Sequence, residues 1–554
     1  MNYFKNLKIN KLNNLIIFNL IKIIIFFQKI KFYFSNLNNL SESKIIKRYK
    51  NFITKNLFEK TYLSKKIILM DTANIPNYII SNLILTSELK KLLKTDIFTF
   101  DFFDRKKNLD NIFDTLQINH LLISLNKEEK VNFEKYFLKS ISKINSKNDL
   151  YKLKIKNVSV GIEIYETILK NGNPTVSYGT FEMYYRIYQG LYCFFYFEKL
   201  FKKKLISALC LSDNTYITTG IPIKLAYKYS IPVFHATPID LNRTEKEYQL
   251  HSRFYKYRKY FDYLSKSQKK LAINNSKKLL SKRLAGKTKI KMFYQEKSAF
   301  TKNLIKRQLK QNDKIKIILT THCFFDNPSA YGKFLFKDFY DWLVFVGKIG
   351  EKIKNKYEIY IKPHRDYLPG TLETLNAIKR KFTNLEIIDP ETTFHQLKSE
   401  GAKIILTGYG SVGHELPLLD FLVINAGYNP HINFSFNIHP KSQKNYRSIL
   451  NNLAAQKVNV IKDEIYTFFY IHYTFNNNDD FLFDSYEEYC RYVNFKMKSE
   501  KCYEFFLKNG TKYLKKYKNL INDSLKSNRC FSIERNLKKK YQKKLIKTNL
   551  SKII

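Results

Sequence analysis

Short hydrophobic runs alternate with longer amphipathic segments along much of the chain. Residues 66–71 (KIILMD) and 205–212 (LISALCLS) have the length and composition of buried strands. Segments with apolar residues three and four positions apart follow such runs, as in residues 334–354, and this spacing is typical of a helix with one buried face. Strands alternating with helices predict an α/β fold with mostly parallel sheets.

The alternation is most regular in the second half of the chain. Five strands are predicted there, at residues 315–320, 357–361, 385–388, 403–406 and 422–425. Helices are predicted between and after them, at residues 334–354, 371–381, 393–399, 411–419 and 442–455. Such βα units build a doubly wound sheet, which binds ligands at the carboxyl ends of its strands.

The first half shows the same pattern with interruptions. Strands are predicted at residues 66–71, 97–103, 205–212 and 231–234, with helices at residues 76–94 and 222–229. Residues 110–200 are rich in helix, and residues 240–310 are predicted to be a helical, basic end of the first lobe with its linker. We therefore expect a basic helical extension (1–65), two Rossmann-like lobes (66–310 and 311–460) and a second basic helical extension (461–554).

The net charge of +49 raises the question of nucleic-acid binding. Lysine is spread over the whole length, in a sequence rich in Asn, Ile, Phe and Tyr, so we attribute most of the charge to compositional bias and expect no nucleic-acid partner. The two ends exceed the average, because residues 1–65 carry thirteen basic and two acidic side chains and residues 531–554 carry eight and one. Basic ends favour contact with an anionic membrane surface.

The apolar segment at residues 15–27 is interrupted by Asn19 and Lys22. It is shorter than the roughly 20 residues that a membrane span requires, and no small-residue cleavage site follows it. An interfacial helix and a helix packed on the protein's own surface are the main alternatives. Six cysteines without a paired spacing suggest a reducing compartment. We expect a cytoplasmic protein that is peripheral to the inner membrane.

Several histidines fall at or just after predicted strand ends in the second lobe. His322 and His431 follow strands, and Lys362-Pro363-His364 closes another. Lysine is a point-charge ligand for phosphate, and histidine can donate to a phosphate oxygen or carry a proton. These residues are therefore candidates for binding an anionic ligand at one edge of the sheet.

The sequence Gly-Tyr-Gly-Ser-Val-Gly at residues 408–413 lies between a strand and a helix. It matches G-x-G-x-x-G, but the next strand ends in Asn425 without the acid that a dinucleotide site uses for the ribose, so we expect no nicotinamide or flavin cofactor. Glycines still let a backbone approach a phosphate. The predicted ligand-binding positions in and after the turn are Gly410, Ser411, Val412, Gly413, His414 and Glu415, with Glu415 or His414 holding the ribose of a nucleotide.

In the first lobe, two strands end in residues that could carry a proton. Asp213 follows the strand at residues 205–212, and His235 closes the next one. An enzyme that transfers a group to a hydroxyl needs a base that deprotonates this hydroxyl, and both residues are candidates for such a catalytic base. A turn or cap role is the alternative for Asp213.

The second-lobe motifs resemble those of surface-polysaccharide glycosyltransferases of GT-B fold, related to the Kdo transferases of capsule synthesis and the glycerophosphate transferases of teichoic-acid synthesis. The resemblance rests on Lys362-Pro363-His364, on residues 408–415 and on residues 423–427, and His235-Ala236-Thr237-Pro238 looks like the His-Gly-Thr-Pro turn of the teichoic-acid enzymes. Arg365, Ala236 and Asp420-Phe421 depart from the family pattern.

This resemblance implies two facing lobes, a nucleotide-activated donor on the C-terminal lobe, a glycan or lipid-linked acceptor, and chemistry without a bound metal or other cofactor. It implies His235 as the base. A sugar-nucleotide epimerase on the same fold is the alternative enzyme, and a nucleic-acid-binding protein is the alternative outside enzymes.

Overall fold

The computed structural model describes most of the chain. The described residues are 6–35, 44–57, 62, 64–72, 76–100, 116, 118–121, 124–237, 240–288, 298–301, 305–475 and short helical pieces between 503 and 537. The chain divides into two compact units. Unit 1 consists of Met1–Ile168, Val176–Leu250 and Asn478–Arg535, and unit 2 consists of Leu169–Thr175, His251–Asn477 and Asn536–Ile554.

Unit 1 is built around a six-stranded sheet in the order β3-β2-β1-β6-β7-β8. All neighbouring strands are parallel except β7 and β8. The strands are β1 (Ile67–Asp71), β2 (Asp96–Phe100), β3 (Asn119–His120), β6 (Ile206–Leu211), β7 (Val233–Thr237) and β8 (Asp240–Thr244). The central strands are nearly continuous apolar runs because helices cover the sheet.

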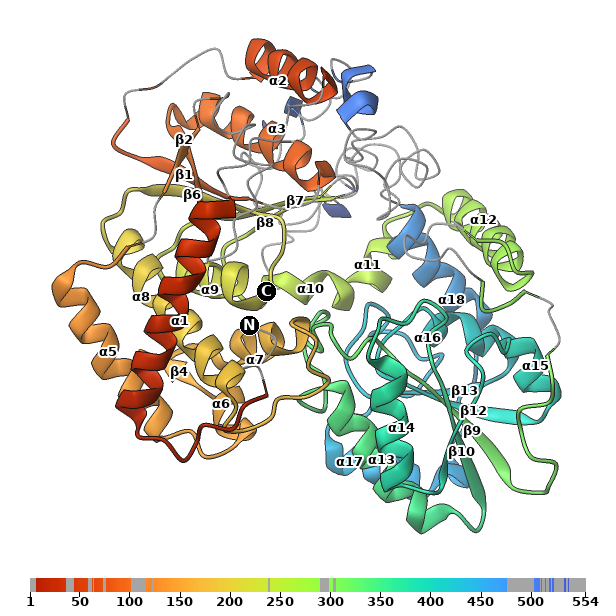
Figure 1. Ribbon diagram of the computed structural model, residues 1–554. Coiled ribbons are helices and arrows are strands. Elements are labelled where there is room, and N and C mark those ends of the chain that lie inside the picture. Colours follow the sequence, from red (N-terminus) through yellow and green to blue (C-terminus); the bar gives the residue numbers. More distant parts are fainter. Residues whose placement is uncertain are drawn as a thin grey trace. The chain divides into compact units, whose positions relative to one another are not determined.

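The helices of unit 1 follow or separate these strands (Figure 1). They are α1 (Asn14–Ser35), α2 (Lys44–Leu57), α3 (Pro76–Leu93), α5 (Lys127–Ser142), α6 (Lys147–Tyr151), α7 (Gly161–Lys170), α8 (Phe181–Lys202), the π-helix η2 (Tyr216–Gly220) and α9 (Ile221–Lys228). A small hairpin pairs β4 (Lys154–Ile155) with β5 (Val158–Ser159). Helix α3 packs on β1, β6 and β7, and α8 is buried along most of its length between α5 and α9.

Unit 2 contains a five-stranded, wholly parallel sheet in the order β11-β10-β9-β12-β13. Its strands are β9 (Ile315–Thr320), β10 (Tyr357–Lys362), β11 (Leu385–Ile387), β12 (Ala402–Thr407) and β13 (Leu422–Asn425). Its helices are α10 (Gln249–Tyr255), α11 (Tyr257–Asp262), α12 (Lys266–Leu284), α13 (Phe339–Ile353), α14 (Thr371–Lys381), α15 (Phe394–Ser399), α16 (Val412–Glu415), η3 (Leu416–Leu419), α17 (Gln443–Asn451), η4 (Leu453–Ala455), α18 (Lys462–Phe469) and the π-helix η5 (Tyr470–Thr474).

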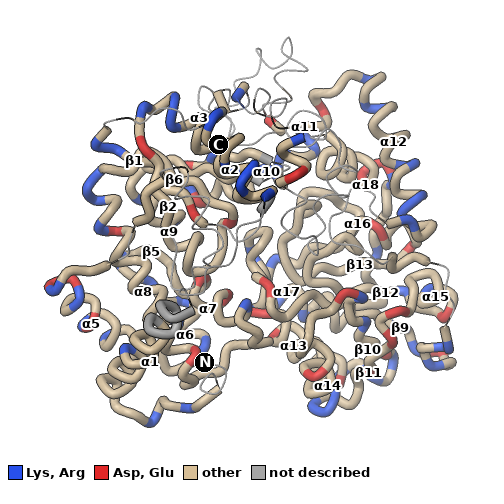
Figure 2. The backbone as a smooth tube through the Cα atoms, turned by 45° about the horizontal axis from the view of Figure 1, so that its top comes forward, with Lys and Arg blue, Asp and Glu red and all other residues tan. Residues whose placement is uncertain are grey.

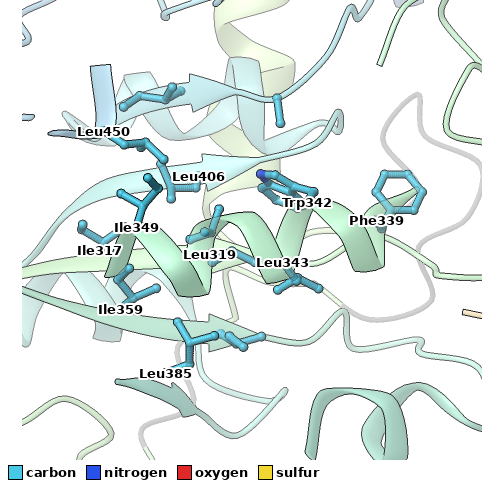
Figure 3. Close-up of a cluster of buried hydrophobic side chains, with 14 of the residues drawn as sticks. Ile317, Leu319, Phe339, Trp342, Leu343, Ile349, Ile359, Leu385, Leu406 and Leu450 are labelled. Carbon is cyan, nitrogen blue, oxygen red and sulfur yellow. The ribbon is translucent and has the colours of Figure 1, made fainter. Parts of the chain in front are cut away.

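The sheet of unit 2 has a hydrophobic core on each face. On one face, Ile317 and Ile359 pack against α13, whose Trp342 is completely buried (Figure 3). On the other face, alternate residues of the same strands, Ile318 and Tyr360, pack in a second core. Because successive strand residues point to opposite faces, this division identifies a sheet that is covered on both sides. Both units are thus Rossmann-like, as predicted.

Predicted and observed elements agree best in unit 2, where the strands at 315–320 and 422–425 have the predicted bounds. The helix expected at 334–354 begins only at Phe339, because the side chain of Asp338 caps it by accepting a hydrogen bond from the N–H of Asp341 at 2.6 Å. The stretch 240–310, expected to be helical, opens with the antiparallel strand β8 instead. The structure also changes units at Leu250, within α10, rather than near residue 310.

Basic residues lie on both units and do not form one block (Figure 2), as the sequence predicted. Within the described part of the chain, no helix combines the length and apolar character that crossing a membrane would require. Most of the C-terminal extension, residues 461–554, lies outside the described residues, apart from α18, η5 and the short helical pieces.

Candidate functional site

Four neighbouring strands of unit 2, β10, β9, β12 and β13, end level with one another. Thr320 of β9 pairs in register with Lys362 of β10 and with Thr407 of β12, and Thr407 pairs with Asn425 of β13. Sequential βα units run outward in opposite directions from β9 and β12, so the topological switch point lies between these two strands. Ligands of open α/β sheets bind outside the carboxyl ends of the strands at such a point.

Two histidines lie at this edge with part of their surface accessible. His322 follows β9, and its ring lies 4.5 Å from that of Tyr409 and 4.9 Å from that of Phe339. Its Nδ1 is buried and has no hydrogen-bond partner in the described part of the chain. The exposed His364 follows β10, close enough to His322 that a positive charge on His322 disfavours one on His364. The switch point therefore offers two imidazoles to an anionic ligand.

The turn after β12 is only partly free to bind an anion through its backbone. Gly410, Ser411 and Val412 are half-buried, as a binding turn requires. The N–H of Gly413, however, already donates to the carbonyl of Gly410 at 3.0 Å. A Cβ on Gly413 would lie 2.3 Å from Nε2 of His431, so this glycine permits close packing of the imidazole. The expectation that backbone N–H groups through Gly413 would face a phosphate is corrected: only Ser411 and Val412 remain as candidates.

Lys362 lies at the end of β10 with its side chain buried. Its ammonium donates to the carbonyl of Pro390 at 2.7 Å and lies 5.6 Å from the ring centre of Phe394. Burial and the neighbouring Arg365 lower the pKa of Lys362 to about 7. The side chain therefore sits at the predicted edge, but it is directed to the loop after β11.

Beneath the turn lies a completely buried ion pair. Nε of Arg283, from α12, donates to Oε1 of Glu415 at 2.6 Å, and the two side chains are 0% and 1% exposed. The hydroxyl of Ser411 donates to the other carboxylate oxygen at 3.0 Å. Glu415 thus connects the turn to α12. In this arrangement both carboxylate oxygens are engaged within the protein, and the ribose contact of Glu415 stays a prediction.

Buried imidazoles surround the ion pair. His414 lies beside His431 and the aromatic rings of α18 and η5, at ring distances of 6.2 Å from His431 and 5.0 Å from Phe468. His431 in turn lies 5.4 Å from His439. Burial lowers the pKa of His414 to about 3 and that of His439 to about 4, and it holds the pKa of His431 well below the ordinary range. All three rings are therefore neutral near pH 7.

Several polar atoms of this layer have no hydrogen-bond partner among the described residues. They are Nη1 and Nη2 of Arg283, Nε2 of His414, Nε2 of His431, Oδ1 of Asn437 and both ring nitrogens of His439. Buried polar groups are nearly always paired in folded proteins, so these atoms call for partners such as water or a bound ligand. His414 and His431, predicted as donor ligands, belong to this buried layer rather than to the accessible edge.

Unit 1 has its own switch point, between β1 and β6. Asp71 ends β1, and its carboxylate accepts hydrogen bonds from the N–H and hydroxyl of Ser212 after β6 and from the amide of Asn82 in α3. Burial, with a smaller contribution from the negative charge of Asp213, raises the pKa of Asp71 to about 6 against the opposing effect of the hydrogen bonds from Ser212. A carboxyl group with such a pKa can exchange a proton near neutral pH.

The two predicted bases lie at the same edge. Asp213 directly follows Ser212, and its Oδ1 accepts hydrogen bonds from the N–H of Asn214 at 2.7 Å and the hydroxyl of Thr215 at 3.1 Å, which are contacts of the alternative turn role. His235 of β7 is 9% exposed and pairs with Leu211 of β6, so it lies one strand away from Asp213 along the sheet edge.

Sequence reasoning missed Arg283 and Asp71. Arg283 lies in a helix with many basic residues, where nothing in the pattern separates a buried arginine from exposed lysines. Asp71 carried a usable signal, since it is an acid at the end of an apolar strand, as Asp213 is. In the part of the chain that the structure describes, no three His, Cys, Asp or Glu side chains group as metal ligands. Metal-independent chemistry remains an expectation.

Comparisons with known proteins give matches only among solved structures. A scan against protein-family profiles finds no match, and neither does a search of curated proteins. The β-Kdo 2,4 transferase KpsC of Thermosulfurimonas dismutans is similar at 13% identity and a TM-score of 0.28, over 48% of this chain and 79% of that one.

Two further structures are similar at the same level. A glycosyltransferase of Rickettsia africae has 12% identity and a TM-score of 0.24, over 84% of this chain and 100% of that one. A UDP-GlcNAc 2-epimerase of Methanocaldococcus jannaschii, solved with UDP-GlcNAc and UDP, has 11% identity and a TM-score of 0.23, over 72% of this chain and 97% of that one. Because scores this low do not establish a common fold over the whole chain, we base the function on the chain's own topology and side chains.

Proposed function

We propose that the protein is a glycosyltransferase of GT-B type, which moves a sugar or polyol phosphate from a nucleotide-activated donor to a surface-polysaccharide or lipid-linked acceptor. The observation that carries the proposal is the edge of the unit 2 sheet. Level strand ends at a topological switch point present a glycine-containing turn, Ser411 and two imidazoles, above a buried layer with an arginine. These groups suit a ligand with phosphates.

In this proposal the donor phosphates bind at the N–H groups of Ser411 and Val412 and beside His322 and His364. Hydrogen-bond donors that are fixed before the reaction stabilise the charge that develops on the leaving phosphate. Lys362 lies behind them, and its lowered pKa makes its charge responsive to a bound phosphate. The fixed hydrogen-bond donors of this edge, with Lys362 behind them, would thus stabilise the leaving phosphate.

We propose unit 1 as the acceptor lobe. Asp71, Asp213 and His235 are the candidate bases, because all three lie at the carboxyl edge of the unit 1 sheet. The base would take the proton of an acceptor hydroxyl as that oxygen attacks the donor carbon or phosphorus. A lipid-linked acceptor would place the enzyme at the cytoplasmic face of the inner membrane, for which the basic ends provide support.

The first test is a thermal-shift screen of the whole chain against CMP, CDP, UDP, GDP and NAD. A ligand at a hundred times its dissociation constant adds about 2.7 kcal/mol of stability, which is readily measured. One nucleotide should stabilise the protein, and the shift should shrink in Ser411→Ala and His322→Ala. His395→Ala is the control, since His395 is also half-buried but lies in α15, where its ring bonds the carbonyl of Leu284. Stabilisation by NAD alone, or by no nucleotide, would refute the donor site.

The second test separates transfer from epimerisation. The stabilising nucleotide is supplied as its sugar conjugates, with and without a glycan acceptor, and nucleotide release and sugar isomerisation are followed. Release that requires the acceptor, and that falls in His235→Ala, Asp213→Asn or Asp71→Asn while nucleotide binding persists, supports transfer and identifies the base. Isomerisation without any acceptor would instead identify an epimerase.

A further inference from the structure

Helix α1 packs on unit 1 with only one of its two apolar faces. Ile17, Phe18, Ile21 and Ile25 are buried, and the ring of Phe18 lies 5.4 Å from that of Phe137 in α5 and 5.9 Å from that of Tyr188 in α8. This face therefore holds the helix on the unit. The side chains of residues 14–28 are described, so the opposite face can be specified too.

The opposite face is apolar and exposed. Six large hydrophobic side chains on it are between 36% and 62% exposed: Leu15, Ile16, Leu20, Ile23, Phe26 and Phe27. At 100° per residue they occupy one continuous arc of the helix, interrupted only by Asn19. A helix that is hydrophobic all round is normally buried all round, and an exposed apolar patch of this kind marks an interaction surface.

The charge around this face indicates what covers it. Residues 1–41 contain six lysines and no acidic residue, and Lys11 and Lys22 are exposed. An apolar strip bordered by lysines complements a membrane surface, where acyl chains meet anionic headgroups. A protein partner would need acidic groups placed beside an apolar groove of matching shape. An anionic lipid surface offers negative charge and apolar acyl chains at every point. Because α1 is held along one face by α5 and α8, its opposite face can lie along a membrane surface with the helix parallel to that surface.

We propose that the exposed face of α1 docks the protein on an anionic membrane surface, with the helix parallel to that surface and Ile23, Phe26 and Phe27 inserted among the lipids. The proposal names the surface that would make the membrane contact of the proposed transferase. It does not depend on the chemistry of the donor site, because every residue involved lies in α1 or just before it.

The test is co-sedimentation of the full chain with vesicles of phosphatidylcholine, alone or mixed with phosphatidylglycerol. The wild type should bind the mixed vesicles, and the triple change Ile23→Ser/Phe26→Ser/Phe27→Ser should lower the affinity at least tenfold. Val131→Ser is the matched control, because Val131 is 49% exposed on α5 and lies outside the proposed face. Lys11→Gln and Lys22→Gln should each lower binding to the anionic vesicles about fivefold and reduce its salt dependence.

A spectroscopic measurement checks insertion without removing the apolar face. Trp342 is the single tryptophan of the chain and is completely buried in unit 2, so it gives a constant background. Phe27→Trp should add an emission that shifts to shorter wavelength when anionic vesicles are added, and Val131→Trp should add one that does not shift. An unshifted Phe27→Trp emission would overturn the proposal.

Two further outcomes would overturn it. The triple variant could bind vesicles as the wild type does, or the wild type could form a dimer without lipid that the triple change dissociates. The second result would assign the face to a second copy of the chain. Nucleotide stabilisation, measured on the same triple variant, should be unchanged, so a failure of membrane docking can be distinguished from a failure of the proposed transferase.

Discussion

The buried pair of Arg283 and Glu415 makes a sharp prediction about stability. Both side chains are at most 1% exposed, and Nη1 and Nη2 of Arg283 have no hydrogen-bond partner within the described chain, so the carboxylate is the main compensation for the guanidinium charge. Replacing Glu415 by Gln leaves a buried positive charge without its counter-charge. We therefore expect Glu415→Gln to destabilise unit 2 strongly.

The expected size follows from measured cases of the same kind. Breaking a buried ion pair by removing one partner costs about 3–5 kcal/mol. For a domain of roughly 150–250 residues, 1 kcal/mol lowers the melting temperature by about 2–4 °C, so the expected decrease is about 6–20 °C. Replacing the whole pair by apolar side chains of similar volume is often close to neutral, so Arg283→Met/Glu415→Leu should recover most of the loss.

Tryptophan fluorescence during thermal or urea unfolding is the appropriate assay, because Trp342 lies in the core of unit 2 and reports on that unit. Nucleotide stabilisation is then measured on the double variant, in which folding is preserved. If nucleotide binding survives there, neither the Glu415 carboxylate nor its hydrogen bond to Ser411 is needed for binding. If binding is lost while stability is retained, the carboxylate is needed, either as a contact to the ligand or as the group that holds Ser411.

A small effect of the single substitution would refute this reasoning. If Glu415→Gln changed the unfolding free energy by less than about 1 kcal/mol, the pair would not be compensating a buried charge. The carboxylate would then be available to a ribose, as the sequence predicted.

Three further predictions concern neighbouring groups. The folded pKa of Lys362, about 7, lies below the unfolded value of about 10.4, so the unfolded state binds more protons between these two pH values. The unfolding free energy should therefore rise between about pH 7 and pH 10, by up to about 1.4 kcal/mol per pH unit. Urea unfolding at several pH values should show a smaller rise in Lys362→Met. The folded pKa of His414, about 3, lies below the unfolded value of about 6.5, so the neutral ring contributes its full stability above pH 6.5 and this contribution is lost as the pH falls. The unfolding free energy should therefore fall less steeply with decreasing pH in His414→Phe than in the wild type. An unchanged slope would contradict the burial of His414 as a neutral ring. Gly413→Ala should lower the unfolding free energy, measured in urea, by about 1–3 kcal/mol because its Cβ would clash with His431. Gly410→Ala should lower it by less than about 1 kcal/mol, because the nearest atom to its Cβ would be 3.8 Å away. Equal effects of the two substitutions would contradict the packing of Gly413 against His431.

The strands were predictable where they are fully buried and short. The runs at 315–320 and 422–425 are mostly apolar because helices cover both faces of the sheet, and their bounds matched. Strand β8 was missed because Asp240–Thr244 is polar and pairs only with β7 at the sheet edge. Its existence depends on an antiparallel partner, which no local pattern reveals.

The accessible part of the site was predictable in the same way. His322, His364 and Ser411 follow strand ends, and the parallel topology brings those ends into one row. The buried part was not. Arg283 precedes Glu415 by 132 residues and comes from a different helix. Their pairing depends on tertiary packing, which the local sequence pattern does not reveal. Likewise, Gly413 matched a phosphate-binding pattern, but its lack of a side chain serves the imidazole of His431.

The two layers of the unit 2 edge have different physical consequences for ligand binding. Donors on the accessible layer can bind a phosphate only if the turn that carries them is held in place, and the hydroxyl of Ser411 is tied to Glu415 and through it to Arg283. Low-dielectric surroundings strengthen these bonds and also make each unpaired atom of the layer costly. A ligand that lets Arg283 or the neutral imidazoles form hydrogen bonds would therefore gain more affinity than the same contacts provide in water. On this reasoning the buried layer restricts the turn to one geometry, and the N–H donors of the accessible layer select a ligand that can accept hydrogen bonds.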